Sequence, residues 1–171
     1  LFVCVKGGSF DGHSAAAEML EKGAAAVVCD HDLGLGEKQI IVDNTRRSYG
    51  ELCAAWFGHP EKKLKMIGVT GTNGKTTITN IIKHILMKNG HKTGLVGTIQ
   101  NEIGGEVLHT DNTTPMTHDF MELLAKMVEA DCEYVVMEVS SFGLVQNRIG
   151  SSHFEVAAFT NLTQDHLDYH K

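Results

Sequence analysis

The chain has 171 residues, 42% hydrophobic and 21% charged, which is ordinary for one folded globular domain or for one domain and part of another. Its 15 Lys and Arg against 21 Asp and Glu give a formal net charge of −6. This charge argues against a general nucleic-acid binder, because no basic excess is present to neutralise phosphates. No apolar run approaches the roughly 20 residues that cross a bilayer, and no signal-peptide pattern opens the chain. We therefore expect a cytoplasmic protein with no membrane insertion.

The cysteines do not suggest a disulfide framework or a zinc site. None of the four has C-x-x-C spacing, and three lie inside apolar runs. We expect buried, reduced thiols at these positions. They are Cys4, Cys29, Cys53 and Cys132.

The first 60 residues alternate strand and helix patterns, as in an α/β unit. Ser14 is the expected N-cap of the first helix and Gly23 its end, while Asp43, Asn44 and Thr45 offer the cap of the second. A polar stretch with a proline follows and favours a domain boundary, so we expect one domain over 1–60 and another over 61–171. The expected elements here are strands 1–5, 24–29 and 39–42 and helices 14–22 and 46–57.

The second segment repeats the alternation with longer elements. Five apolar residues from Ile78 to Leu86 recur at i, i+3, i+4, i+7 and i+8, which predicts an amphipathic helix. A glycine pair at Gly104 and Gly105 indicates a hairpin. We expect an α/β fold with a mostly parallel sheet covered on both faces. Its strands are predicted at 65–69, 94–96, 133–139 and 155–159, and its helices at 75–89 and 117–130.

A glycine-rich loop between a strand and a helix carries the strongest chemical signal. It reads Gly-Val-Thr-Gly-Thr-Asn-Gly-Lys-Thr-Thr over 68–77, where glycines allow backbone N–H groups to turn toward phosphate oxygens. Lys75 is expected to reach the β- and γ-phosphates of ATP, and the Thr76 hydroxyl to ligate Mg²⁺. The expected nucleotide-binding residues are Gly71, Thr72, Asn73, Gly74, Lys75, Thr76 and Thr77.

The loop departs from the strict G-x-x-x-x-G-K-[ST] pattern, which would need glycine where Val69 stands. Gly68 and Gly71 lie on either side of that position instead. An alternative is a glycine-rich turn that happens to end in Lys-Thr. Strand, loop, lysine, threonine and helix all agree, however, so the phosphate-binding interpretation is preferred.

This loop resembles the variant P-loop of the Mur ligase superfamily, whose members join an amino acid or peptide to a carboxylate. Three further stretches, at 111–115, 137–148 and 159–170, are similar to one branch, the UDP-N-acetylmuramoyl-dipeptide ligases. The opening residues resemble the later half of that branch's uridine-nucleotide-binding domain. The resemblance implies a P-loop central domain preceded by part of a smaller α/β domain that binds the UDP substrate.

The resemblance also implies an activity. Such enzymes use ATP and Mg²⁺ to convert the carboxylate of UDP-MurNAc-L-Ala-D-Glu to an acyl phosphate, which the amine of a free amino acid attacks to form an amide. The chain would then be the middle portion of a three-domain monomer in peptidoglycan synthesis. We expect the amino-acid site and the family's carbamylated lysine to lie outside it, and residues 1–171 alone to be inactive.

Individual residues take roles from the same resemblance. Glu138 ends a buried strand at the edge where α/β sheets bind ligands, and it is implied as a Mg²⁺ ligand. His166 is implied as a second ligand, with Lys75, Glu138 and His166 as the catalytic set. An isolated strand-end acid or lone histidine would more often be structural. The residues that match the muramoyl-peptide site are Asn112, Thr113, Thr114, Ser140, Gln146 and Arg148.

Several points stay open at this stage. Phe142 stands where this family commonly has histidine, which leaves the role of that position in doubt. Lys6 and His13 lie in a loop that either approaches the uridine diphosphate or is an ordinary surface loop. A sibling ligase, such as a tripeptide-adding enzyme or a folylpolyglutamate synthetase, is the closest alternative function. A P-loop kinase or GTPase is more distant, since no Asn-Lys-x-Asp string is present, and an inactive nucleotide-binding module is a third interpretation.

Overall fold

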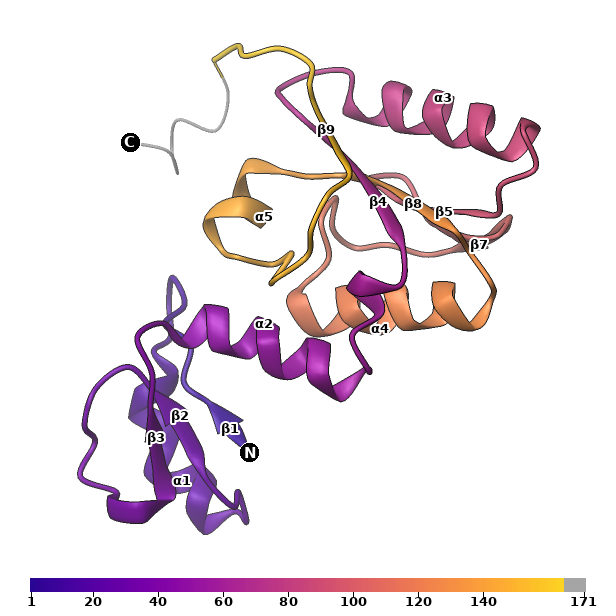
Figure 1. Cartoon of the computed structure of the whole chain (residues 1–171). Helices are drawn as coiled ribbons and strands as arrows, with labels where there is room; N and C mark the ends of the chain where they lie inside the picture. Colours follow the sequence, from indigo (N-terminus) through magenta and orange to yellow (C-terminus); the bar gives the residue numbers. More distant parts are fainter. Residues whose placement is uncertain (165–171) are drawn as a thin grey trace.

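The computed structural model describes residues 1–164, which form a small and a large β-sheet with helices packed against them (Figure 1). The small sheet is entirely parallel, in the order β1-β2-β3. Its strands and helical elements are β1 (Phe2–Val3), η1 (Gly12–Ala15), α1 (Ala16–Glu21), β2 (Val27–Cys29), η2 (Gly36–Lys38) and β3 (Gln39–Ile41).

The first predicted helix is shorter than expected and begins differently. Residues 12–15 form the 3₁₀ turn η1, and the α-helix starts only at Ala16. The cap is Asp11, whose carboxylate accepts a hydrogen bond from the His13 N–H at 3.0 Å. Ser14 instead donates its hydroxyl to the Asp11 carbonyl. The expectation of Ser14 as N-cap was therefore wrong, because an aspartate three residues earlier takes that role.

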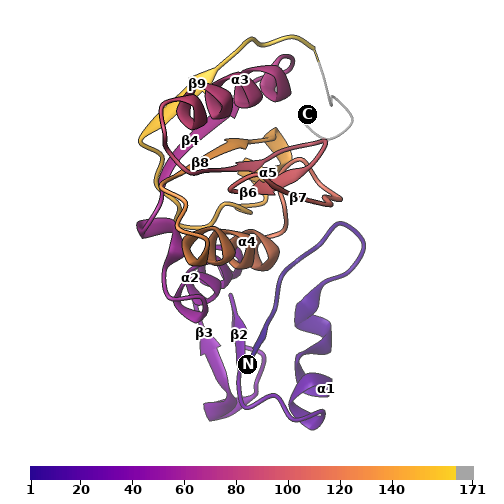
Figure 2. The ribbon, with the colours of Figure 1, turned by 90° about the vertical axis from the view of Figure 1, so that its right-hand side faces the viewer.

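Helix α2 (Thr45–Trp56) joins the small sheet to the rest of the chain, and Figures 1 and 2 show it beside α4 (Thr117–Glu129). Asn44 caps it as predicted, accepting from the Arg47 N–H at 3.0 Å. Its buried Cys53 and Ala54 belong to the core of the larger sheet. The 3₁₀ turn η3 (Pro60–Lys62) then leads into that sheet.

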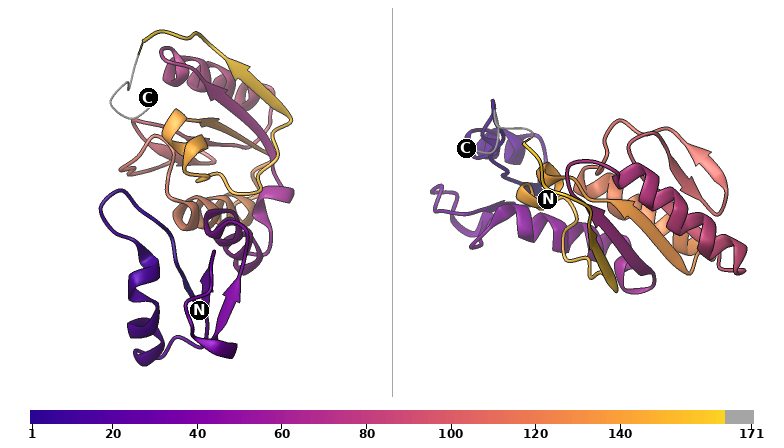
Figure 3. Two further views of the ribbon diagram at one scale, coloured as in Figure 1. Left: turned by 90° about the vertical axis from the view of Figure 1, so that its left-hand side faces the viewer. Right: turned by 90° about the horizontal axis from the view of Figure 1, so that it is seen from above.

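The large sheet has six strands in the order β7-β6-β5-β8-β4-β9. Four strands pair in parallel, while β6 and β7 form the predicted hairpin and run antiparallel. Strand β9 lies beside β4 at the edge of the sheet (Figure 3). The strands are β4 (Lys65–Thr70), β5 (Thr93–Val96), β6 (Asn101–Ile103), β7 (Glu106–Leu108), β8 (Tyr134–Glu138) and β9 (Val156–Phe159).

Helices cover both faces of the large sheet, as the alternating pattern predicts. Helix α3 (Lys75–Lys88) lies on one face and α4 on the other (Figure 2). The core is densest under α4, where Phe120, Leu124 and Met127 are fully buried against β5 and β8. The predicted α/β fold with a mostly parallel sheet is confirmed.

The apolar stripe of α3 is buried less than its periodicity suggests. Ile81 and Ile85 are 53% and 55% exposed, whereas Thr79 is fully buried. A 3.6-residue period identifies an apolar face but does not determine how much of that face the sheet covers. A short helix after β8, α5 (Ser141–Val145), was not predicted. Among the helices of residues 1–164, none is long and apolar enough to cross a membrane.

Candidate functional site

The glycine-rich loop connects β4 to α3 at the carboxyl edge of the large sheet, as predicted. Gly71 and Gly74 have φ values of 123° and 87°, a region that side chains with a Cβ rarely adopt. The first intrahelical hydrogen bond runs from the Ile78 N–H to the Gly74 carbonyl. The N–H groups of the first turn of α3 therefore precede the helix hydrogen-bond ladder and are directed toward the loop.

The segment that follows β9 forms hydrogen bonds with the glycine-rich loop. The Thr72 N–H donates to the Asn161 carbonyl at 2.9 Å, and the Asn73 N–H donates to Asn161 Oδ1 at 3.1 Å. Thr160 Oγ donates back to the Asn73 carbonyl at 2.7 Å. These bonds occupy two loop N–H groups, so an anion would be bound by the later N–H groups, from Gly74 onward.

The positively charged side chain of Lys75 spans the loop. Its ammonium donates to the carbonyl oxygens of Gly71 and Thr72 at 2.7 and 2.9 Å. An ammonium has three N–H groups, so two of them hold the loop in shape while the charge stays at the helix N-terminus. This arrangement concentrates positive potential where phosphate oxygens would bind.

Glu138, the last residue of β8, is 1% exposed and lies beside the start of α3. Its Oε2 accepts from Thr76 Oγ at 2.9 Å and from Thr98 Oγ at 3.0 Å, and its Oε1 accepts from the Thr98 N–H at 2.9 Å. Gly97 permits this approach, because a Cβ there would lie 2.8 Å from Oε1. Thr98 was not predicted as a site residue, since a single threonine after a strand carries no sequence signal.

The surroundings of Glu138 fit a divalent cation. Within residues 1–164 its carboxylate accepts hydrogen bonds only from neutral hydroxyl and N–H groups. Burying a carboxylate without a positive partner costs on the order of several kcal/mol, because the ion loses its hydration. Oxygen donors from a carboxylate and a hydroxyl are what Mg²⁺ prefers, so Thr76 and Glu138 form a suitable donor set. His166, the second expected ligand, lies outside the described residues.

Four of the six expected substrate residues form one hydrogen-bonded network. The Thr114 hydroxyl donates to the Glu138 carbonyl at 3.1 Å and accepts from the Ser140 N–H at 2.9 Å. Arg148 Nη1 donates to the Thr114 carbonyl, and Arg148 Nε donates to Gln146 Oε1, each at 2.9 Å. Ser140 of this network also lines a cavity together with Lys75 of the P-loop.

The other two expected substrate residues lie at the edge of this network. Thr113 Oγ is 3.1 Å from Thr98 Oγ and so connects to the Glu138 carboxylate. Asn112 is exposed, and its carbonyl accepts from the Thr110 hydroxyl at 2.9 Å. Phe142 lies in the first turn of α5, half-buried, where its carbonyl accepts from the Gln146 N–H.

Cavities lie on both sides of the P-loop lysine and threonine. One of about 300 Å³ is lined by Lys75, Ser140 and Phe159, among other residues, and the second, also about 300 Å³, by Thr76, Asn80 and Glu138. The first cavity therefore brings Ser140, one of the expected substrate residues, beside Lys75 of the P-loop, and the second is lined by two of the expected metal ligands, Thr76 and Glu138. Both volumes fall at the small end of the usual range for ligand sites.

A third cavity, about 140 Å³, lies where the small and large sheets meet. It is lined by Arg46 and Arg148, together with Tyr49 and Gln146 among others. Arg46 Nη2 donates to the Lys6 carbonyl at 2.6 Å, which fixes the loop after β1. Burial raises the pKa of Tyr49 to about 12, so this phenol is neutral at physiological pH.

Comparison with known proteins agrees with this geometry. Residues 69–171 match the Mur ligase middle domain. A UDP-N-acetylmuramoyl-L-alanyl-D-glutamate–2,6-diaminopimelate ligase of Parabacteroides distasonis is 47% identical over 100% of this chain and 36% of its own length. The Bacillus cereus protein of the same name is 46% identical, over 100% and 35%. The chain thus spans about a third of the length of these relatives.

A solved structure of a ligase with that same name superposes on 94% of this chain and 32% of its own, with a TM-score of 0.76 and 29% sequence identity. The family match covers more than half of the residues and includes the P-loop lysine, Glu138 and the Thr114–Arg148 network. The chain therefore belongs to the Mur ligase family and carries its middle domain from residue 69 onward.

Proposed function

We propose that this chain forms the ATP-binding portion, and part of the acceptor site, of a ligase that adds the third amino acid to UDP-MurNAc-L-Ala-D-Glu in peptidoglycan synthesis. The main observation in support is the buried Glu138, which joins Thr76 of the P-loop to Thr98 through hydrogen bonds of 2.9 and 3.0 Å. Its main-chain carbonyl also accepts from Thr114 of the acceptor network. The residues proposed to bind nucleotide, metal and acceptor are therefore connected through the last residue of one strand.

In this proposal ATP binds with its phosphates on the N-terminus of α3. Lys75 and the first-turn N–H groups neutralise the β- and γ-phosphates. Thr76 and Glu138 hold Mg²⁺, which would offset charge on the transferring phosphoryl group when bound. His166 is proposed as its second ligand.

The acceptor is proposed to lie against Thr113, Ser140 and Arg148, with Asn112, Thr114 and Gln146 around it. Arg148 is the natural partner for a carboxylate or diphosphate because its guanidinium donates two parallel hydrogen bonds. Ser140 lines the same cavity as Lys75, so an acceptor carboxylate there would face the γ-phosphate. The ATP phosphates and the acceptor carboxylate repel each other, so a site that holds both needs positive charges, and this edge of the large sheet supplies them.

The proposed chemistry proceeds in two balanced steps. The acceptor carboxylate oxygen attacks the γ-phosphorus, the bond to the β-phosphate oxygen breaks, and ADP leaves with an acyl phosphate formed. The amine of the incoming amino acid then attacks the acyl carbon. Phosphate leaves with the carbon–oxygen bond electrons, and the amine nitrogen loses a proton to complete the amide.

For the incoming amino acid we propose 2,6-diaminopimelate, on the names of the relatives alone. The small sheet, with residues 1–60, is proposed as part of the domain that binds the uridine nucleotide, and 61–171 as part of the ATP-binding domain. We also propose a cytoplasmic monomer, whose 171-residue portion does not turn over by itself.

The deciding experiment measures phosphate release from ATP and Mg²⁺ by the intact enzyme. UDP-MurNAc-L-Ala-D-Glu is added with diaminopimelate, lysine or another amino acid, one at a time. Release that requires the nucleotide substrate and diaminopimelate together supports the proposal, and release with lysine instead corrects only the amino acid. If a muramoyl tripeptide or a folate is needed, the enzyme is a sibling ligase; ATP hydrolysis that ignores all acceptors contradicts a ligase.

A further inference from the structure

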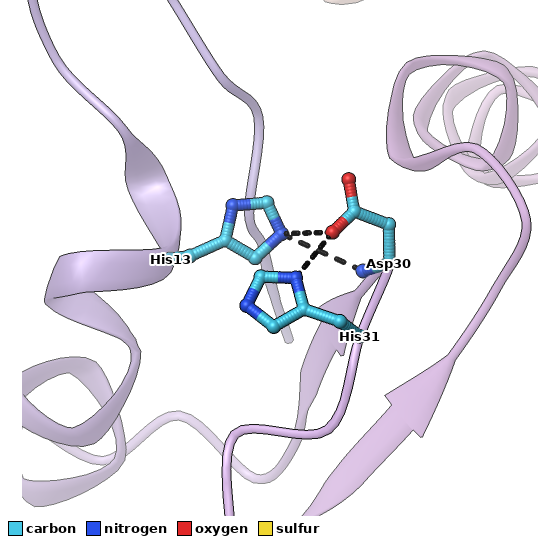
Figure 4. Close-up of side chains that lie close together, drawn as sticks. All are labelled: His13, Asp30 and His31. Carbon is cyan, nitrogen blue, oxygen red and sulfur yellow. Dashed lines mark hydrogen bonds and ion pairs between the residues drawn. The ribbon is translucent and has the colours of Figure 1, made fainter.

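A group of metal-binding side chains lies in the small sheet, far along the chain from the P-loop. His13 comes from η1, and Asp30 and His31 follow directly after β2 (Figure 4). Their ligand atoms all lie within 4.8 Å of one another. The carboxyl ends of β1 and β2 bring η1 and the β2 exit to one edge, which is where parallel sheets gather functional side chains.

The three side chains converge on one point. His13 Nε2 is 3.1 Å from Asp30 Oδ1, and His31 Nδ1 is 2.6 Å from the same oxygen. The two imidazole rings are stacked, with centroids 4.8 Å apart (Figure 4). Each imidazole nitrogen that faces Asp30 Oδ1 either donates an N–H to it or, with its lone pair free, can share a metal ion with it.

The outer nitrogen of His13 has the partner that a metal-bound histidine usually has. His13 Nδ1 is 2.6 Å from Asp11 Oδ1, and the His13 side chain is only 7% exposed. A ligating histidine generally donates its other ring N–H to a carboxylate, which fixes the tautomer and aims the free nitrogen at the ion. Here Asp11 would take that role and direct Nε2 toward Asp30.

We propose that His13 Nε2, Asp30 Oδ1 and His31 Nδ1 bind a divalent transition-metal ion, with Zn²⁺ as its best match. Zinc bonds of about 2.0–2.1 Å in a tetrahedron place neighbouring ligand atoms about 3.3 Å apart. The 3.1 Å between His13 Nε2 and Asp30 Oδ1 is near this value, whereas the 2.6 Å between His31 Nδ1 and Asp30 Oδ1 would have to widen on binding. Two imidazoles and one carboxylate favour Zn²⁺ over Mg²⁺, which prefers oxygen donors only. Three protein ligands leave the fourth position to water or to an incoming group.

Such an ion would strengthen the link between two segments that the His13–Asp30 contact of 3.1 Å already joins. The main-chain N–H of Asp30 lies 3.5 Å from His13 Nε2, at the limit of a hydrogen bond. A metal bond between η1 and the β2 exit would close a 17-residue separation and hold the edge of the small sheet in one conformation. Bound zinc should therefore raise the melting temperature of the protein.

The test is a Zn²⁺ titration of the intact, tag-free protein after removal of metals with a chelator, in the presence of excess Mg²⁺. We expect one equivalent bound at this cluster, and tetrahedral absorption bands when Co²⁺ is used instead. Asp11→Asn should weaken binding by about 10–100-fold, as loss of an outer partner does in known sites. His31→Asn removes a ligand and should weaken it further; His31 is 59% exposed, so its replacement leaves the core intact.

A matched control is His109→Asn, which breaks an exposed His–Asp pair of 3.0 Å that lacks a third ligand in the described chain. This variant, and Glu138→Gln in the other sheet, should bind zinc as the parent does. Zinc bound equally by the parent and by His31→Asn would overturn the proposal. So would a parent that binds no zinc, in which case imidazole N–H groups that donate to Asp30 hold the three side chains together.

Discussion

Two carboxylates at the ends of parallel strands meet very different neighbours in this molecule. Glu138 at the end of β8 is 1% exposed and accepts from hydroxyl and N–H groups of Thr76 and Thr98. Asp30 after β2 has a side chain 43% exposed and meets two imidazoles. The same sheet geometry delivers both carboxylates, but the groups beside them differ. Oxygen donors match the Mg²⁺ proposed at Glu138, and imidazoles match the Zn²⁺ proposed at Asp30.

A third buried carboxylate, Glu102, has a lysine of the protein itself as its positive partner. Glu102 in β6 is 6% exposed and accepts from Lys83 Nζ at 2.6 and 2.8 Å. Gln100 donates a further hydrogen bond of 2.7 Å. Glu102 therefore has its positive partner within the fold, whereas Glu138 accepts only from neutral groups within residues 1–164. The following predictions test this distinction.

Lys75→Ala should have the largest effect, because it removes the positive charge at the phosphate edge. Turnover of ATP by the intact enzyme should fall about 10³-fold or more, as loss of phosphate-binding cations does elsewhere. Phosphate release and ADP affinity measure the loss. Zinc binding at His13 should not change, since the two sites are in different sheets. A variant with normal nucleotide binding and turnover would contradict the phosphate-loop assignment.

Glu138→Gln should reduce turnover about 10²-fold and raise the Mg²⁺ concentration needed for it, because an amide oxygen is a weaker metal ligand. The amide can still accept from the Thr98 N–H, so the fold should persist. Glu133→Gln is the matched control, a 51%-exposed side chain just before the same strand. If both substitutions have equal effects, Glu138 has no metal role.

Glu102→Gln should cost stability without affecting the metal response. Burial raises the pKa of Glu102, but the Lys83 and Gln100 hydrogen bonds and the Lys83 charge outweigh it and hold the pKa below the ordinary 4.5. A depressed carboxyl pKa stabilises the fold above that ordinary value, and the contribution is lost as pH falls through the folded-state pKa. We expect about 2 kcal/mol lower unfolding free energy at neutral pH.

Urea unfolding at neutral pH and in acid measures this difference. The gap between the parent and Glu102→Gln should shrink in acid, where Glu102 itself becomes protonated. Glu122→Gln is the control, since its pair with Lys126 is on the surface and such pairs contribute about 0–1 kcal/mol. A gap that stays constant with pH would show that the charge of Glu102 is not what stabilises the pair.

Much of the fold could be predicted because its signals are local. The P-loop, the hairpin at Gly104 and the buried strand β8 each follow from a short run of residues. The predicted start of the first helix was wrong because Asp11 and Ser14 are both residue types that cap helices well. Which of them becomes the cap depends on tertiary packing. The exposure of Ile81 could not be read from its period, since tertiary packing decides which part of a stripe is covered.

The sequence names candidate site residues where family motifs contain them, and it names none where only the fold brings side chains together. Lys75 and Thr76 are in one recognisable string, but Thr98 reaches Glu138 across 40 residues and has no pattern of its own. The His13 cluster is similar, since two parallel strands bring η1 and the β2 exit together. Neither the Thr98–Glu138 contact nor the His13 cluster can be predicted from sequence spacing, because each depends on the order of strands in a sheet.

Thr98→Val should have the smallest effect and is the most specific test of how Glu138 is held. Valine keeps the β-branched shape and the main-chain N–H, and it removes only the hydroxyl that donates to Glu138 Oε2 at 3.0 Å. We expect the Mg²⁺ concentration for half-maximal turnover to rise about tenfold, the lower end for loss of an outer partner. Mn²⁺ binding with ADP, followed by electron paramagnetic resonance, gives a readout independent of turnover.

Thr98→Ser separates positioning from packing. Serine restores the hydroxyl without the methyl group, so it should recover the parent's Mg²⁺ and Mn²⁺ affinities if the hydrogen bond is what orients Glu138. If serine instead behaves like valine, the methyl contact matters and the hydroxyl does not. Because the same hydroxyl lies 3.1 Å from Thr113 Oγ, its loss should also raise the KM for the acceptor, which would connect metal and acceptor sites through one side chain.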